Sequence, residues 1–350
     1  MVVLPMKSRL PVVRDHAIAA TADLQSLWLA YWLGQEQLKQ RLEGPLAIAD
    51  DWDERLSPVV ERAVPAQLQQ LGDPAGELLG FSNEAMRAVV ELLLQPSTDL
   101  HLHTIRQHAS QGRLLLGLLA APAVKVLSGR LLLPDQLSAI PAFGGERLAA
   151  LVLASQLQAA LPQLELVPLF GRKLWRFVEL GWALAETVAS RQQLQPQRLR
   201  LLLLLVVFGW ALPAAALKRQ FDQLRLYHQD KARLAGNRAL LKRLEQLRPP
   251  AAATLALLQG SNSCQRQLQL WGLNPGWYHS CLREWRSDLP QQLRGPYARA
   301  LELLLRLAGA NQLLESPLAV EQAVTASLQP LVSASELPTL LAVRPKGLQL

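Results

Sequence analysis

The sequence predicts an all-helical protein, and three observations support this fold class. Half of the 350 residues are apolar, but only 5% are aromatic, so Leu and Ala must fill most of the core. Leucine and alanine suit helices, whereas β-branched and aromatic side chains suit strands. Apolar residues also recur every three or four positions in most segments, which is the helical period. We therefore expect one large helical domain or two smaller ones, and almost no β-sheet.

The N-terminal part contains two predicted helical stretches. The first begins after Thr21, has one apolar face, and ends at Gly44-Pro45, which favour a helix stop. The second covers 50–70, and the LGDPAG segment that follows it breaks the helical pattern. We place a segment boundary near residue 80.

The next part, up to residue 161, predicts four further helices. Ser82 can cap the first, which ends at Gln95-Pro96 because the residue before a proline avoids helical geometry. Ser97 or Thr98 can cap the second. An apolar helix over 114–127 and a helix over 146–161 follow.

The remaining helices are predicted from apolar spacing and from Pro and Gly stops. The 174–190 segment has a narrow stripe of small residues suited to close packing. An apolar helix over 201–212 precedes a long basic helix over 214–247, which Arg248-Pro249-Pro250 ends. The later predicted helices cover 255–260, 271–285, 296–310 and a short pair around 318–343.

The uncharged stretch 201–217 approaches the length of a membrane-spanning helix. It is slightly short, it contains Gly209 and Pro213, and charged residues bound it. Because the other predicted helices are amphipathic and need an apolar partner, we interpret it as a buried central helix rather than a membrane span.

Cysteine usage and the N-terminus favour a cytoplasmic location. Cys264 and Cys281 cannot form a disulfide framework, and neither has the paired spacing of a zinc site. The first 16 residues carry scattered charges and prolines without the apolar core of a signal peptide.

Five segments, 86–124, 133–157, 174–190, 203–212 and 268–285, follow one another in an order and spacing that can be compared with known helical domains. In that order they resemble the HDOD family of bacterial signalling domains, which are related to the HD phosphohydrolases. The resemblance implies an HD-like helical bundle with an extra N-terminal helical segment. It divides the chain into an N-terminal extension (1–80), an HDOD-like domain (81–290, with its HD-like half from about 165) and C-terminal helices packed on that domain (291–350).

The departures from the family pattern concern the metal centre. HD hydrolases use clustered His and Asp side chains to hold divalent metals that activate water. The corresponding positions here are Phe177, Val206 and Val207, and Glu284 and Trp285 stand near the last family histidines. Apolar side chains do not ligate a hard cation. The resemblance therefore implies a non-enzymatic protein with no metal or other cofactor.

Other reactive patterns receive structural interpretations. His101, His103 and His108 lack the i, i+4 spacing of helical zinc sites. No P-loop spacing follows the glycines near 72–76 or 144–145. No nucleophile-elbow pattern surrounds Ser261 or Ser263, and no acid is placed to orient His279. We interpret Cys264 and Cys281 as small core residues.

Two segments remain as candidate binding surfaces. Residues 218–248 hold nine basic and three acidic residues, a net charge of +6 within a chain of +8. This segment is either a solvated face or a surface for an acidic partner, a nucleotide or nucleic acid. Trp28, Tyr31 and Trp32 are either core residues or, where exposed, an interface. The basic candidates are Arg225, Lys231, Arg233, Arg238, Lys242 and Arg243.

The sequence thus predicts a non-catalytic regulatory protein of the HDOD type that acts through protein–protein contacts with a separate signalling partner. The alternative is a basic helical protein that binds nucleic acid or an anionic nucleotide through 218–248. Steep weakening of DNA binding with salt would favour the alternative.

Overall fold

The fold is all-α, as the composition predicts. The computed structural model describes residues 24–33, 56–81, 145–167, 169–260, 263–273, 276–315, 321–329, 331–333 and 335–342. Every regular element within these ranges is a helix, and no strand occurs in them. Predicted helices between residues 82 and 144 lie outside the described residues, as do His101, His103 and His108.

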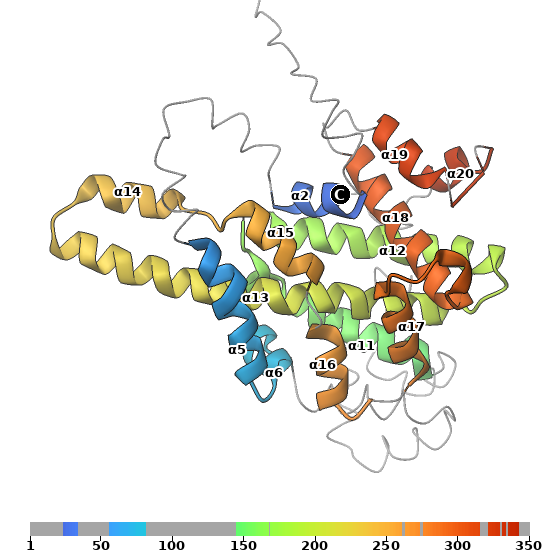
Figure 1. Ribbon diagram of the computed structural model, residues 1–350, viewed down its shortest axis with the longest axis horizontal. Coiled ribbons are helices and arrows are strands. Elements are labelled where there is room, and N and C mark those ends of the chain that lie inside the picture. The colour runs from blue at the N-terminus through green and yellow to red at the C-terminus, as the bar shows by residue number, and fades with distance from the viewer. Residues whose placement is uncertain are drawn as a thin grey trace, which may run out of the picture.

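Figure 1 shows the described helices. In chain order they are α2 (Leu24–Trp32), the π-helical η1 (Val59–Ala63), α5 (Val64–Gln70), α6 (Pro74–Leu79), α11 (Gly145–Ala159), the 3₁₀ turn η3 (Leu161–Leu164), α12 (Phe170–Arg191), α13 (Pro196–Leu234), α14 (Arg238–Gln246), α15 (Ala251–Gly260), α16 (Ser263–Leu270), α17 (Trp277–Arg286), the 3₁₀ turn η4 (Gln291–Leu293), α18 (Pro296–Leu314), α19 (Glu321–Leu328) and α20 (Leu337–Leu341).

Helix α13 forms the centre of the bundle. It packs against α11, α12, α16 and α18, and α12 also packs against α18. Gly181 of α12 permits close approach, because a Cβ there would lie 2.8 Å from Cδ2 of Leu203. The small-residue stripe predicted in 174–190 therefore has a packing role where α12 meets α13.

The uncharged stretch 201–217 is buried throughout. Helix α13 is long and apolar enough to cross a membrane, but 94% of its most apolar 18-residue window is buried by the rest of the protein. This burial is what the central-helix interpretation expects.

The predicted break at Pro213 is wrong. Residues 201–212 and 214–247 were expected to form two helices, but α13 continues through Pro213 from Pro196 to Leu234. A proline inside a helix removes one hydrogen bond and costs about 3 kcal/mol. The residues on both sides of Pro213 are buried, so tertiary packing offsets this cost.

The basic segment is also not one helix. It breaks after Leu234, where Gly236 adopts φ +62°, a left-handed conformation that suits glycine. The side chain of Asn237 then accepts a 3.0 Å hydrogen bond from the Leu240 amide and starts α14. The two helices form a hairpin that projects from the bundle (Figure 1).

The N-terminal helices join the same core. Helix α2 packs on α18 and α12, and the LGDPAG segment, expected to break the helical pattern, starts the short helix α6 at Pro74. Gly80, at φ +68°, ends α6. One continuous hydrophobic cluster contains residues from all three predicted segments. The division of the chain at residues 80 and 290 stays a prediction.

Candidate functional site

The positions that the resemblance assigns to a lost metal centre lie in the hydrophobic core. Phe177, Val206 and Val207 are all buried. The ring of Phe177 lies 5.1 Å from Trp32 and 5.8 Å from Trp210, both at steep interplanar angles. Edge-to-face packing of this kind stabilises aromatic clusters. Among the described residues, no group of three or more His, Cys, Asp or Glu side chains could hold a metal ion.

The N-terminal tryptophans are core residues and not an exposed interface. Trp28 and Trp32 are buried, because α2 lies over Phe177 and against α18. Tyr31 is only partly buried, and the ammonium group of Lys173 lies 3.9 Å from the centre of its ring. The interface interpretation therefore fails for the two indoles, since their apolar faces are already covered.

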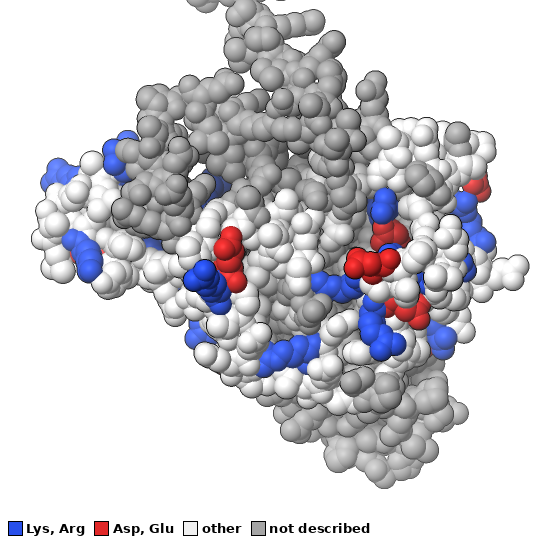
Figure 2. All heavy atoms as spheres, viewed as in Figure 1, with Lys and Arg blue, Asp and Glu red and all other residues white. Residues whose placement is uncertain are grey.

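The basic candidates share one projecting structure, which we name the basic arm (residues 218–248). It consists of the outer part of α13, the turn at Ala235–Asn237, and α14 with the residues that follow it. Figure 2 shows Lys and Arg side chains on the arm with little acidic surface, whereas acidic and basic groups are mixed over the body at the opposite end.

The candidate residues on α13 are largely engaged within the arm. Arg225 pairs with Asp222 at 2.8 Å, and Arg233 pairs with Asp230 at 3.0 Å. The Lys231 ammonium lies 4.3 Å from the ring centre of Tyr227. Exposed pairs of this kind contribute little to stability, but they reduce the charge that α13 presents.

The candidate residues on α14 form the more strongly charged face. Leu244 packs inward, whereas Arg238, Lys242 and Arg243 are exposed. None of these three cations forms an ion pair with any residue that the structure describes. The structure thus brings them together on one small helix.

Sequence reasoning missed the exposed apolar groups on the arm. Leu226 and Tyr227 are each 55% exposed, and Leu234 is 90% exposed at the end of α13. In the sequence these residues are visible only as apolar positions between charged ones. The inward face of an amphipathic helix gives the same pattern, so the sequence does not show that they are exposed. Large apolar groups beside cations are typical of protein interfaces.

Burial shields the cysteine and histidine candidates. Nε2 of His279 is buried and lacks a hydrogen-bond partner among the described residues. Burial raises the pKa of Cys264 to about 12 and that of Cys281 to about 11. The thiolate is the nucleophilic form of cysteine, so both thiols are inert near neutral pH. Ser261 lies outside the described residues.

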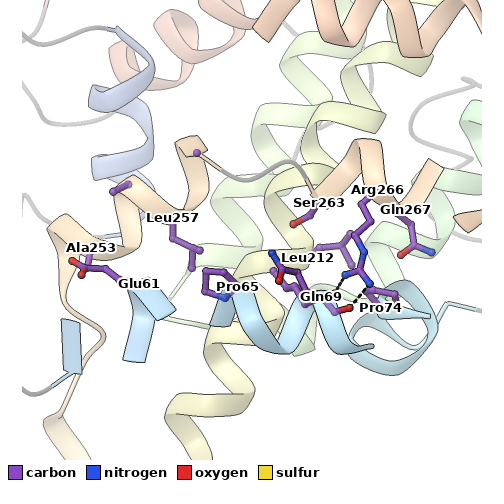
Figure 3. Close-up of a pocket in the computed structure, with 13 residues that line it drawn as sticks. Glu61, Pro65, Gln69, Pro74, Leu212, Ala253, Leu257, Ser263, Arg266 and Gln267 are labelled. Carbon is purple, nitrogen blue, oxygen red and sulfur yellow. Dashed lines mark hydrogen bonds between the residues drawn. The ribbon is translucent and has the colours of Figure 1, made fainter. Parts of the chain in front are cut away.

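A mainly apolar cavity of about 470 Å³ lies between α5 and α6 on one side and α15 and α16 on the other (Figure 3). Pro65, Leu212 and Leu257 contribute apolar walls. Arg266 points toward the end of α5 and donates hydrogen bonds to backbone carbonyls, including that of Leu71 at 3.3 Å. Its guanidinium therefore caps α5, as a cation near a helix C-terminus commonly does.

The described residues thus form an exposed basic arm, an apolar cavity and a packed apolar centre. No family model, no curated protein and no solved structure matches this chain.

Proposed function

We propose that this chain is a non-catalytic regulatory protein of the HDOD type that acts through protein–protein contacts in the bacterial cytoplasm. The observation that carries the proposal is the packing at Phe177, Val206 and Val207. These are the positions where the resemblance implies an ancestral metal centre, and all three are buried among aromatic and aliphatic side chains. A water-activating metal has no place in such surroundings.

The basic arm is the proposed contact surface for an acidic protein partner. It projects from the bundle and combines exposed Leu226, Tyr227 and Leu234 with the cations of α14 (Figures 1 and 2). The apolar groups can supply affinity, while the charges steer an acidic partner toward the arm.

Affinity capture from the native cell with the full chain as bait tests the proposal. The test variant is Arg238→Gln with Lys242→Gln and Arg243→Gln. The matched control is Arg172→Gln with Arg283→Gln and Arg299→Gln, which removes the same charge from exposed positions outside the arm. A partner that binds the control but not the arm variant supports the proposal. Equal weakening of partner binding in the arm variant and the control variant overturns the proposal, as does phosphodiesterase activity with manganese.

A second candidate function is binding of nucleic acid or an anionic nucleotide through the same arm. Three exposed cations without ion pairs to any described residue lie on α14 and favour it. Affinity for random-sequence DNA should then fall steeply with salt, because each bound phosphate releases a counterion. Neutralising Arg238, Lys242 and Arg243 should reduce the slope of log K against log salt by about 0.9 for each phosphate that the variant no longer neutralises. Absence of DNA binding at low salt would eliminate this candidate.

A further inference from the structure

A second, polar pocket of about 570 Å³ lies at the junction of α15, α17, η4 and α18. Its wall contains three arginines, Arg286, Arg294 and Arg306, and the carboxylate of Glu302. Its volume falls within the range of about 300–1,000 Å³ that small-molecule sites occupy. The basic arm contributes no residue to it.

One of the three arginine charges is neutralised inside the wall. Nε of Arg306 donates a 2.5 Å hydrogen bond to Oε1 of Glu302. The other carboxylate oxygen of Glu302 accepts a 2.7 Å hydrogen bond from the indole nitrogen of Trp285. Both oxygens of Glu302 therefore have partners, and this carboxylate compensates Arg306.

The other two arginines are held in place by neutral groups. Arg286 donates a 3.0 Å hydrogen bond to the carbonyl of Gln259. Arg294 donates to the carbonyls of Leu289 and Ser287 at 3.0 and 2.9 Å. Backbone carbonyls orient a guanidinium but carry no formal charge, and each guanidinium has five N–H donors. The wall therefore presents two oriented cations that have no carboxylate partner among the described residues.

Burial makes this arrangement more favourable for an anion. Desolvation lowers the pKa of Arg286, because its positive charge is partly removed from water. Arginine stays protonated at neutral pH despite such a shift. A bound anion would supply the negative charge that the surrounding protein lacks.

We propose that this pocket binds the phosphate group of a small phosphorylated molecule, held by Arg286 and Arg294. A phosphate monoester carries a charge of about −1.5 to −2 at pH 7, which matches the two uncompensated cations. Its three terminal oxygens suit the planar, forked donors of arginine. The side chains of Gln25 and Gln291 also line the pocket and can bind the uncharged remainder of the ligand.

Isothermal titration of the full chain at low ionic strength tests the site, with inorganic phosphate, AMP and citrate as separate probes. Arg286→Gln and Arg294→Gln should each weaken phosphate or AMP binding about tenfold to a hundredfold, because a charge-assisted hydrogen bond contributes about 1.5–3 kcal/mol. The matched control is Arg283→Gln, an exposed position on the same helix that does not line the pocket. Preferential binding of AMP would identify a nucleotide-sized ligand, and equal binding would identify the phosphate group as the recognised part; both support the site.

Several outcomes overturn the site. These are no binding of phosphate or AMP by folded protein, tighter binding of citrate than of either, or equal weakening in Arg283→Gln. Circular dichroism melting of each variant separates loss of binding from loss of the fold. If Arg286→Gln unfolds, Arg294→Gln carries the test, because Arg294 lies in the turn after η4. The arm variant proposed above should retain phosphate binding, so failure here leaves the proposed arm function intact.

Discussion

The indole nitrogen of Trp32 donates a 2.7 Å hydrogen bond to Oε1 of Gln312, 280 residues later in the chain. Both side chains are buried. The amide nitrogen of Gln312 in turn donates a 2.6 Å hydrogen bond to the carbonyl of Lys173. One glutamine on α18 therefore satisfies polar groups of both α2 and α12.

Gln312→Met should destabilise the protein, because it leaves the buried indole N–H of Trp32 without its partner and removes a second hydrogen bond to the Lys173 carbonyl. A buried donor left unsatisfied costs about 1–3 kcal/mol. Urea denaturation followed by circular dichroism measures the change in the free energy of unfolding. Adding Trp32→Phe removes the orphaned donor, so the double variant should lose less than the sum of the two single losses. Strict additivity would contradict the coupling.

Gly309→Ala should destabilise the protein although alanine favours helices by about 1 kcal/mol. A Cβ at Gly309 would overlap the buried ring of Trp28. Overpacking a tightly filled core costs about 1–3 kcal/mol. The control is Gly260→Ala at the end of α15, where a Cβ would meet no atom within 4 Å. Thermal melting should show a lower midpoint for the first variant alone.

Asn237→Ala should loosen α14 without unfolding the bundle. It removes the side-chain oxygen that accepts from the Leu240 amide, a cap that contributes about 0.5–2 kcal/mol. Hydrogen exchange read by mass spectrometry should accelerate in 238–246 and stay unchanged in α12. Asn237→Asp keeps an acceptor and serves as the control; identical exchange in both variants would contradict the cap.

Neither cysteine should react with iodoacetamide at pH 7.5 while the protein is folded. Burial raises both thiol pKa values, to about 12 for Cys264 and about 11 for Cys281, so the thiolate fraction is very small. The half-buried Cys281 should react first as the pH rises toward 11, and mass spectrometry of peptides identifies the site. Rapid alkylation of Cys264 in the folded state would contradict its burial.

The raised pKa of Cys264 also predicts that the protein becomes less stable at high pH. The folded protein keeps the Cys264 proton at pH values where the unfolded chain, with a thiol pKa near 9, loses it. The thiol's contribution to stability is therefore complete below about pH 9 and is lost as the pH rises toward 12. Cys264→Ala should show a shallower loss of stability than wild type over this range.

The sequence predicted local elements better than long-range relationships. The expected helices at 146–161 and 174–190 match α11 and α12 closely, because their apolar spacing and flanking residues are local signals. The Trp32–Gln312 bond has no local signal. The continuity of α13 through Pro213 could not be predicted either, since it depends on burial by helices far away in the chain.

The candidate sites show the same limit. The basic composition of 218–248 was visible, but the turn at Gly236 that folds it into a hairpin was not anticipated. The pocket arginines were missed altogether. Arg286, Arg294 and Arg306 belong to separate segments with ordinary charge density, and only the packing of α17 on α18 brings them together.

The 39 residues of α13 span about 58 Å, and one continuous helix therefore contains both the buried centre and the inner half of the arm. A partner that pulls on the arm applies force to a helix whose inner part is packed within the bundle. Residues 201–217 are all buried, so Pro213 is held by its packing, and the exposed part of the helix begins only beyond Leu217. In the packed part of α13, Gly209 lies against Cys264. Both residues line a small cavity, which shares Trp285 and Arg286 with the arginine pocket. The helix that carries the inner half of the arm therefore also lines this small cavity, through Val206, Gly209 and Trp210.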